Sequence, residues 1–464
     1  MRSVANPQQS QSDLTKPGRV HRPRRQRVHG FRLMFAVSFL LILAGCTTWL
    51  AGLMPDSTAE NLTPASSTAT PSAETEATPT FEPLPTSSGP MLLPLWVPPQ
   101  FDPESKTTAG DLLRERLDAF MQAHPDISIE VRVKSSSGPG SLLEALTSTN
   151  AAAPSAVPGL IALNRSDLEA AAIKGLIYPL DGLSASMDDS DWYPYARQLA
   201  SLQDSLFGLP FAGDALVLLY RPARIGDYPL ATWDDVIERG SPLIFQAGDD
   251  QAMVTLALYL SAGGIVQDGQ GRPALDPKIL TKVFDLFQTG ARKGLFPTSI
   301  TQYQSSGQAW QAFQEGQADW IITWSSNYLG EKPSDTNAAL LPPLDTTNMA
   351  AANGWVWALS DPDPVRRQAS IALAEFLVQP DFMSIWSEAA GYLPTRPSAL
   401  AGWQSESLRQ LLDQLALSAQ IRPANELMAS IGPVLMEGTL SVLKGQSAPV
   451  QAAQLAAEKL GVTK

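Results

Sequence analysis

Short apolar segments alternate with amphipathic helical segments from residue 91 onward, and this alternation most constrains the fold. Residues 91–97 are an apolar run, residues 111–124 place apolar side chains at helical spacing, and residues 127–133 alternate apolar with polar side chains. Another apolar run follows at 160–163. Because strands and helices in this order form parallel sheets covered by helices, the sequence predicts an α/β fold with a mostly parallel sheet.

The second half of the chain repeats this pattern without repeating the sequence. Apolar runs at 216–220, 243–246 and 320–324 predict strands, and residues 364–379 predict an amphipathic helix. From residue 405 onward the pattern is almost entirely helical. We therefore expect a second α/β region followed by a helical C-terminal segment.

Residues 1–45 have the organisation of a secretion signal. A basic stretch at 1–32 precedes an apolar run at 33–43 that is too short to span a bilayer, and two small residues then lead to Cys46, the only cysteine in the chain. This order resembles the lipobox of bacterial lipoproteins, which implies cleavage before Cys46 and attachment of lipid, such as palmitate, to that residue. The alternative is a structural cysteine in the core. In both cases no disulfide can form within the chain.

Residues 46–90 are predicted to be a disordered linker, because Ser, Thr, Ala and Pro dominate them. The chain carries a formal net charge of −13, and the part that follows the basic signal is more acidic still. Such a body is a poor partner for nucleic acid, whose affinity comes mainly from Lys and Arg. We expect an exported protein that is held to the cell membrane by lipid on its extracytoplasmic side.

Several motifs after the linker carry a family resemblance. They include Phe-Met-Gln-Ala-His-Pro at 120–125, Gly-Leu-Ile-Tyr-Pro-Leu-Asp at 175–181, Leu-Phe-Gly-Leu-Pro-Phe at 206–211, Phe-Gln-Glu-Gly-Gln-Ala at 313–318 and Gly-Tyr-Leu-Pro-Thr-Arg at 391–396. Their order resembles that of the extracellular solute-binding proteins of ABC importers, in the family 1 carbohydrate branch that includes maltose-binding protein. The likeness covers most of residues 92–460.

This resemblance implies a two-lobed periplasmic-binding-protein fold of type II, in which each lobe is a mostly parallel sheet flanked by helices. The first lobe would contain residues 91–210 and 345–390, and the second would contain residues 211–340 and 391–464. Such a protein is a monomer that closes on a solute by a hinge motion, performs no chemistry and delivers the solute to a pair of permease subunits.

The residues offer little for catalysis. Two of the three histidines lie in the predicted signal, and His124 lies at a helix end before a proline, which is an ordinary structural position. Paired acids such as Asp234 with Asp235 and Asp249 with Asp250 lie where helices begin, so capping accounts for them. The sequence therefore predicts neither an enzyme nor a metal or cofactor site.

The binding residues that the sequence predicts are aromatic platforms for the apolar faces of a sugar and polar groups for its hydroxyls. They are Trp96, Asn164, Arg165, Asp214, Trp324, Tyr328, Trp355, Trp357, Tyr392 and Arg396. For each tryptophan the alternative is a packing role in the core, and for Arg396 it is an ion pair with an acid.

The sequence departs from the family pattern at two places. Tyr220 is followed by Arg221 and Pro222 where many members have Asn, and Trp324 does not align firmly with the family's aromatic residue. These departures leave a sugar, a sugar phosphate, a polyol or an unrelated solute open. The alternatives to import are a two-lobed ligand sensor and an assembly lipoprotein.

The predicted anchor leads to a direct test. Cys46→Ser removes the only thiol that can carry lipid, so we expect this variant in the soluble fraction after cell fractionation, while the wild type sediments with membranes. Retention of the variant in the membrane fraction would contradict the anchor and indicate an uncleaved membrane segment.

Overall fold

The computed structural model describes residues 89–226, 232–345 and 349–461. They belong to one compact unit, residues 84–464. Cys46, the predicted signal and nearly all of the predicted linker lie outside the described residues.

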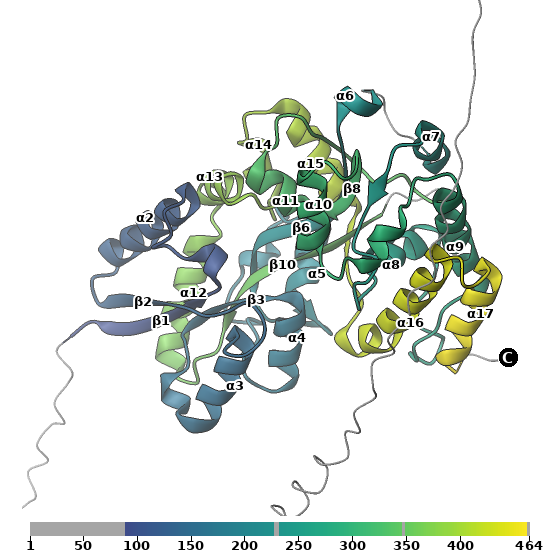
Figure 1. Ribbon diagram of the computed structural model, residues 1–464. Helices are drawn as coiled ribbons and strands as arrows, with labels where there is room; N and C mark the ends of the chain where they lie inside the picture. The colour runs from purple at the N-terminus through teal and green to yellow at the C-terminus, as the bar shows by residue number, and fades with distance from the viewer. Residues whose placement is uncertain (1–88, 227–231, 346–348, 462–464) are drawn as a thin grey trace, which may run out of the picture. The chain divides into compact units, whose positions relative to one another are not determined.

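One sheet forms the framework of this unit (Figure 1). Its strands follow the order β2 (Ile127–Val133), β1 (Met91–Val97), β3 (Leu160–Asn164), β10 (Ala350–Leu359), β6 (Leu209–Tyr220), β8 (Trp320–Trp324) and β7 (Leu243–Ile244). In addition, β11 (Ala419–Ile421) pairs with β10, and β9 (Asn337–Ala339) pairs with β6. Two short strands, β4 (Ser201–Leu202) and β5 (Ser205–Leu206), form a separate hairpin.

Parallel pairing joins β1 to β2 and to β3, β7 to β8, and β10 to β11, whereas β6 and β10 run antiparallel to each other and to their other neighbours. The α/β fold expected from the sequence is thus confirmed, with two long antiparallel strands at its centre.

Helices cover the sheet and form the C-terminal segment. They are α2 (Thr108–Ala123), α3 (Leu142–Ala152), α4 (Arg165–Ile173), α5 (Pro194–Ala200), α6 (Pro222–Ile225), α7 (Trp233–Arg239), α8 (Met253–Ser261), α9 (Pro277–Arg292), α10 (Ser306–Gln314), α11 (Ser325–Glu331), α12 (Pro364–Leu377), α13 (Pro380–Ala390), α14 (Pro397–Ala401), α15 (Glu406–Ser418), α16 (Asn425–Leu443) and α17 (Pro449–Lys459). The described residues also form four short 3-10 helices, Pro99–Phe101, Pro154–Ala156, Ser186–Asp188 and Thr298–Gln302.

Local chemistry explains many helix boundaries. The hydroxyl of Thr107 accepts a hydrogen bond from the N–H of Gly110, so α2 begins earlier than its apolar pattern predicts. Thr232 and Asp235 form a reciprocal capping box at α7. At α13, Gly391 takes the left-handed conformation that ends the helix.

The buried apolar side chains divide into three clusters. Two of them lie against β1, β3 and β10, and the third surrounds β8 and the second half of β6. We call the part built around the first two clusters, residues 91–215 and 352–419, the first lobe. The part built around the third, residues 216–339 and 428–456, is called the second lobe.

The C-terminal segment divides between the clusters. The buried apolar side chains from Leu393 to Ala419 pack in a first-lobe cluster, and those from Met428 to Ala456 pack in the second-lobe cluster. The hydroxyl of Tyr193 also donates to Asp413 at 2.7 Å, which ties α15 to the first lobe. An amphipathic pattern shows that a helix has a buried face but not which sheet that face meets.

β6 and β10 belong to both lobes. β6 pairs with β10 up to Ala215 and with β8 from Leu216 onward. Met349 and Ala351, at the start of β10, pack in the second-lobe cluster, whereas Trp357 packs in the first. These two strands, together with the segment that joins β11 to α16, connect the lobes along the chain.

Among the described residues, α16 is the one helix long and apolar enough to cross a membrane, but half of its apolar window is buried inside the protein. Met428, Ile431 and Leu435 from this helix pack in the second-lobe cluster. The burial of these side chains accounts for its composition.

The close approach of Gly213 to its neighbours makes a testable prediction. A Cβ atom there would lie 2.0 Å from the hydroxyl of Tyr195 and 2.8 Å from the backbone oxygen of Leu393. Since both neighbours are fixed in the core, Gly213→Ala should lower the free energy of unfolding by about 2 kcal/mol or more in urea denaturation. Gly307→Ala in α10 is the control: a Cβ there meets nothing closer than 3.9 Å, and stability should be unchanged or slightly raised. Equal effects of the two substitutions would contradict this account.

Candidate functional site

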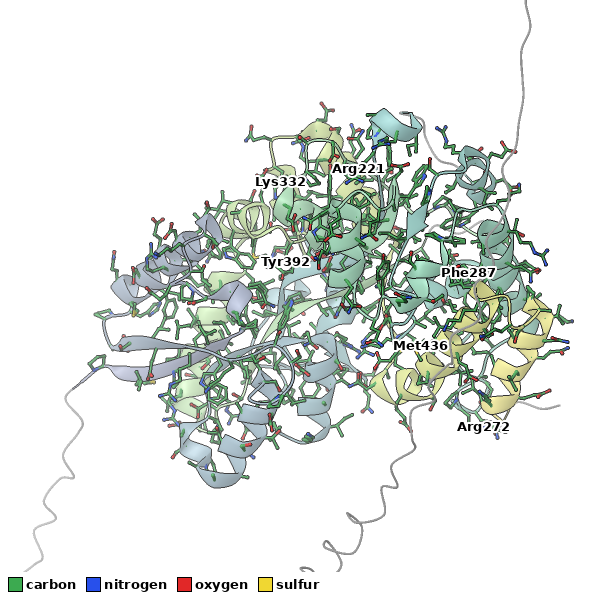
Figure 2. The ribbon with its side chains drawn as sticks, in the orientation of Figure 1. Arg221, Arg272, Phe287, Lys332, Tyr392 and Met436 are labelled. Carbon is green, nitrogen blue, oxygen red and sulfur yellow. The ribbon has the colours of Figure 1, made fainter. Side chains whose placement is uncertain are left out.

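The junction where β6 and β10 pass between the lobes brings together five of the predicted residues. They are Asp214, Trp324, Tyr328, Trp355 and Tyr392, which come from β6, the end of β8, α11, β10 and the loop after α13. Tyr392 is labelled in Figure 2, where it lies near the middle of the view.

Asp214 occupies the point at which β6 changes partner. Its carboxylate accepts hydrogen bonds from the N–H of Ser326 at 2.9 Å and from the hydroxyls of Ser325 and Ser326 at 2.8 and 2.6 Å. These donors lie in the first turn of α11, where backbone N–H groups have no partner within the helix. Asp214 therefore fixes the start of α11 against β6.

Burial raises the pKa of Asp214 to about 6, although the hydrogen bonds from Ser325 and Ser326 favour its ionised form. The removal of the carboxylate from water is thus the larger effect. Since Tyr392 lies near this carboxylate, burial and the negative charge of Asp214 both raise the pKa of its phenol. The phenol is therefore a neutral hydroxyl at physiological pH.

The ring of Phe101 connects Tyr392 with Trp355 on the first-lobe side. The ring of Phe101 lies 5.3 Å from that of Tyr392 and 5.4 Å from that of Trp355, the latter in an edge-on arrangement. Trp355 and Tyr392 are both half-buried, and Tyr392 also forms a side-chain hydrogen bond with Gln100. Sequence analysis missed Gln100 and Phe101, although they follow the end of β1 at the edge where carboxyl ends of strands line a crevice.

Backbone pairing holds Tyr392 in this place. The N–H of Gly213 donates to the oxygen of Leu393 at 2.9 Å, and the N–H of Leu393 donates back at 2.8 Å. The hydroxyl of Tyr195 donates to the oxygen of Pro394 at 2.8 Å. The loop after α13 is thus fixed to β6 beside Asp214.

Tyr328 and Trp324 form the second-lobe side of the junction. Trp324 is the last residue of β8 and packs against the second-lobe cluster, whereas Tyr328 packs against clusters of both lobes. Burial raises the pKa of Tyr328. Half-buried aromatic side chains therefore lie on both lobes near the point where β6 changes partner, and one of them, Tyr392, lies close enough to Asp214 for its charge to raise the pKa of the phenol.

The structure gives two of the predicted tryptophans packing roles. Trp96 and Trp357 are each 2% exposed. Trp357 stacks on Phe211 at 4.1 Å, and Trp96 packs with the side chains on the opposite face of the sheet. Neither indole offers an exposed face to a ligand, because the sheet is covered by helices on both sides.

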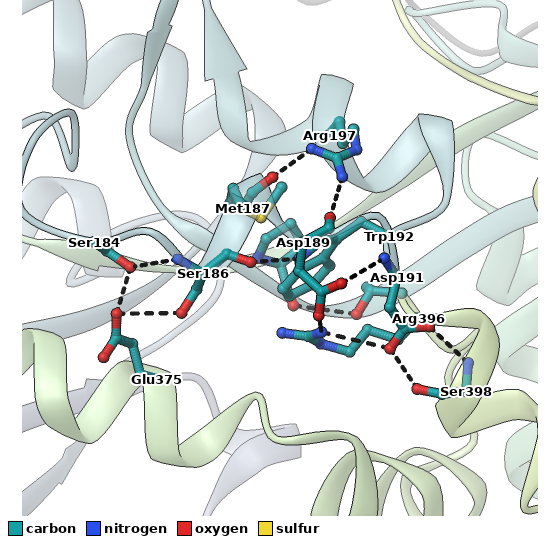
Figure 3. Close-up of polar contacts among 12 residues, drawn as sticks. Ser184, Ser186, Met187, Asp189, Asp191, Trp192, Arg197, Glu375, Arg396 and Ser398 are labelled. Atoms are coloured by element: carbon teal, nitrogen blue, oxygen red, sulfur yellow. Dashed lines mark hydrogen bonds and ion pairs between the residues drawn. The ribbon is translucent and has the colours of Figure 1, made fainter.

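Arg396 is held inside the first lobe (Figure 3). Its guanidinium lies 3.7 Å from the centre of the Trp192 ring and forms ion pairs with Asp189 at 3.3 Å and Asp191 at 3.5 Å. The loop that carries Asp189 and Asp191 is also fixed to α14, because the backbone N–H of Ser398 donates to the carboxylate of Asp191 at 3.0 Å. Of the two roles predicted for Arg396, the structure shows the ion pair.

Asn164 and Arg165 serve the ends of two helices. Asn164 caps α4, since its side-chain oxygen accepts the N–H of Asp167 at 3.0 Å. Arg165 donates to the backbone oxygens of Gln198, Leu199 and Ser201 at 2.6–3.0 Å, where α5 ends. The side chains of Asn164 and Arg165, which the sequence predicts as ligand contacts, therefore form hydrogen bonds with the protein's own backbone.

Two cavities of the described part of the chain lie away from the junction. One of about 570 Å³ is lined by Asp181, Asp188, Arg197 and Asp204, among others. Another of about 680 Å³ lies between the start of α9 and α17, where Ile265, Leu275 and Ala457 contribute apolar surface. Within residues 89–226, 232–345 and 349–461, no group of three or more His, Cys, Asp or Glu side chains is arranged to hold a metal ion.

A family model described as bacterial extracellular solute-binding protein matches residues 115–410. No curated protein sequence matches the chain.

Solved structures give the same fold at low sequence identity. Maltose-bound MalE3 of T. maritima is 19% identical with a TM-score of 0.61, and the match covers 80% of this chain and 99% of that one. A cyclic α-maltosyl-1,6-maltose binding protein of Arthrobacter globiformis is 17% identical with a TM-score of 0.66, over 80% and 98% of the two chains. A ribitol complex from Agrobacterium radiobacter is 19% identical with a TM-score of 0.58, over 81% and 99%.

The raised pKa of Asp214 makes a prediction about pH. Because the carboxyl has a higher pKa in the folded protein than in the unfolded chain, the folded state binds a proton more strongly. The resulting stabilisation is complete below about pH 4, where both states are protonated, and is lost as the pH rises through about 6. The free energy of unfolding of the wild type should therefore fall across this interval relative to that of Asp214→Asn, as measured by urea denaturation at several pH values. Parallel pH profiles of the two proteins would contradict the buried state of this carboxyl.

Proposed function

The chain belongs to the bacterial extracellular solute-binding protein family, and we propose that it is the lipid-anchored capture component of an ABC importer for a carbohydrate. The family binds solutes and does not transform them, so the junction is a site of capture and not of catalysis. Lipid on Cys46 and the linker at 46–90 would hold the body near the membrane, where it would meet its permease subunits as a monomer.

The observation that carries this proposal is the meeting of Trp355, Tyr392 and Asp214 between two lobes joined by continuous strands. Aromatic rings suit the apolar faces of a sugar, and carboxylate and phenol groups suit its hydroxyls. Solved structures of similar fold hold maltose, tagatose and ribitol, which are all neutral polyhydroxyl compounds.

The charges near the junction favour a neutral solute. Arg165 and Arg396, the two cations predicted as ligand contacts, already have backbone or carboxylate partners. An anionic ligand such as a sugar phosphate would therefore meet Asp214 without a free arginine from this pair to offset the repulsion. Of the solute classes that the sequence leaves open, a neutral sugar or polyol fits best.

Closure would occur by bending of β6 and β10 near Ala215 and Ala352. We propose lobe boundaries at these positions, with residues 391–419 assigned to the first lobe instead of the second. The first-lobe packing of Leu393, Trp403 and Leu415 supports this reassignment.

Isothermal titration calorimetry of the mature protein with maltose, maltotetraose, tagatose and ribitol tests the proposed function. We expect one of these neutral compounds, or a close relative in an extended sugar panel, to bind at a ratio of one to one, with glucose 6-phosphate binding more weakly than glucose. Failure of the whole panel, or a preference for the phosphate, would contradict the proposed solute class.

The role of Trp355 leads to a second prediction for the same assay. Trp355→Leu removes a half-buried indole at the junction and should weaken binding by roughly tenfold or more. Trp96→Leu, which removes a fully buried indole from the first-lobe core, is the matched control. It should lower the melting temperature and leave the affinity of the folded protein unchanged. Equal affinities of both variants would reassign Trp355 to packing.

A further inference from the structure

The long helix α16 of the second lobe begins without a cap of its own. Ala424, the residue before it, makes no side-chain hydrogen bond to the first turn. The backbone N–H of Asn425 instead donates to the carboxylate of Glu169 at 2.8 Å. Glu169 lies on α4 of the first lobe and is 7% exposed. A buried carboxylate of one lobe therefore caps the helix of the other, where the helix dipole favours negative charge.

The side chain of Asn425 makes a second connection to α4. Its amide nitrogen donates to the backbone oxygen of Ser166 at 2.9 Å, and its oxygen accepts from the hydroxyl of Ser166 at 3.1 Å. The guanidinium of Arg422 also donates to this oxygen. The side-chain amide of Asn425 therefore both donates to and accepts from Ser166, in the first turn of α4.

Charged groups gather around this contact in a poorly solvated place. Burial lowers the pKa of Arg165 and of Arg422, and the negative charge of Glu169 opposes this shift in both. The positive charge of Arg422 adds to the lowering at Arg165, whereas Asp167 favours the ionised form of Arg422. Separation of the two helices would remove the opposite charge of Glu169 from Arg422 in this place.

The two helices belong to different cores. On α4, Leu168 and Ala171 pack in a first-lobe cluster, whereas Met428 and Ile431 of α16 pack in the second-lobe cluster. Figure 1 shows the start of α16 beside α4. The hydrogen bonds between them therefore connect the two lobes at the segment that joins β11 to α16, next to Ile421, which pairs with Ala352 of β10.

We propose that Glu169, Ser166, Arg422 and Asn425 form an interlobe latch, which holds the lobes in the described arrangement in the absence of solute. Opening the lobes at this place breaks the cap of α16 and the amide contacts of Asn425. The latch therefore sets the fraction of open protein before any solute binds, and it adjusts apparent affinity through that fraction. This inference rests on the proposed hinge motion but not on the identity of the solute.

The distance between the lobes of the full chain, in detergent and without solute, tests the latch. Spin labels at Ile173→Cys on α4 and Val450→Cys on α17 report it by double electron–electron resonance, in a Cys46→Ser background that keeps labelling specific. Both positions are well exposed, at 79% and 52%. Asn425→Ala removes the amide contacts with Ser166, and Glu169→Ala removes the acceptor for the first N–H of α16. Each should increase the population at a changed interlobe distance by roughly fivefold.

Asp363→Ala is the matched control, because Asp363 caps α12 within the first lobe by accepting the N–H of Val365 at 2.9 Å. It should lower the melting temperature without changing the distance distribution. If Asn425→Ala fails to fold, Ser166→Ala removes a single hydroxyl of the latch and should give a smaller shift in the same direction. Unchanged distributions in the folded latch variants would overturn the proposal.

The result is independent of the sugar titrations. A distance shift together with failure of the sugar panel would leave the latch standing and contradict the proposed solute class. If the wild type binds a sugar but the latch variants show no distance shift, the proposed solute class stands and the latch is contradicted.

Discussion

The shared strands β6 and β10 are the constraint on which the rest of this structure depends. β6 pairs with β10 in the first lobe and with β8 and β9 in the second, and it changes its partner from β10 to β8 between Ala215 and Leu216. β10 begins with Ala351 packed in the second-lobe cluster and continues into the first lobe. Hydrogen bonds between paired strands prevent the strands from sliding past each other, but the strands can bend where their partners change. The lobes are therefore held in fixed register while their relative tilt remains adjustable, which is the requirement for a protein that closes on a solute.

Two buried carboxylates near the lobe boundary accept hydrogen bonds from the starts of helices. Asp214 takes three donors from the start of α11, and Glu169 takes the first N–H of α16. Both carboxylates act at the start of a helix, where the orphan N–H groups and the dipole favour negative charge. The solute that we propose must therefore compete with contacts that the protein makes with itself, and selectivity depends on how well its hydroxyls replace them.

The sequence predicts the elements of this fold well and the roles of individual side chains less well. The strand at 127–133 and the helix at 364–379 follow from local periodicity, which depends only on neighbours in the chain, and the structure has them at Ile127–Val133 and Pro364–Leu377. Trp96 and Trp355 have similar settings in the sequence, at the end of a strand or within one, but one is buried and the other half-buried. The difference arises because tertiary packing decides which sheet face a helix covers, and no local pattern records it. The partnership of Glu169 with Asn425 joins residues far apart in the chain and left no signal in the sequence.

The most direct test is to find which backbone amides exchange more slowly with solvent when a solute is bound. Hydrogen–deuterium exchange of the mature chain, with and without a neutral sugar that it binds, locates these amides without any substitution. The account predicts protection concentrated at residues 97–101, 353–357 and 391–393, around the junction of β6 and β10. Protection confined to the apolar cavity between α9 and α17, with no change at the junction, would contradict it.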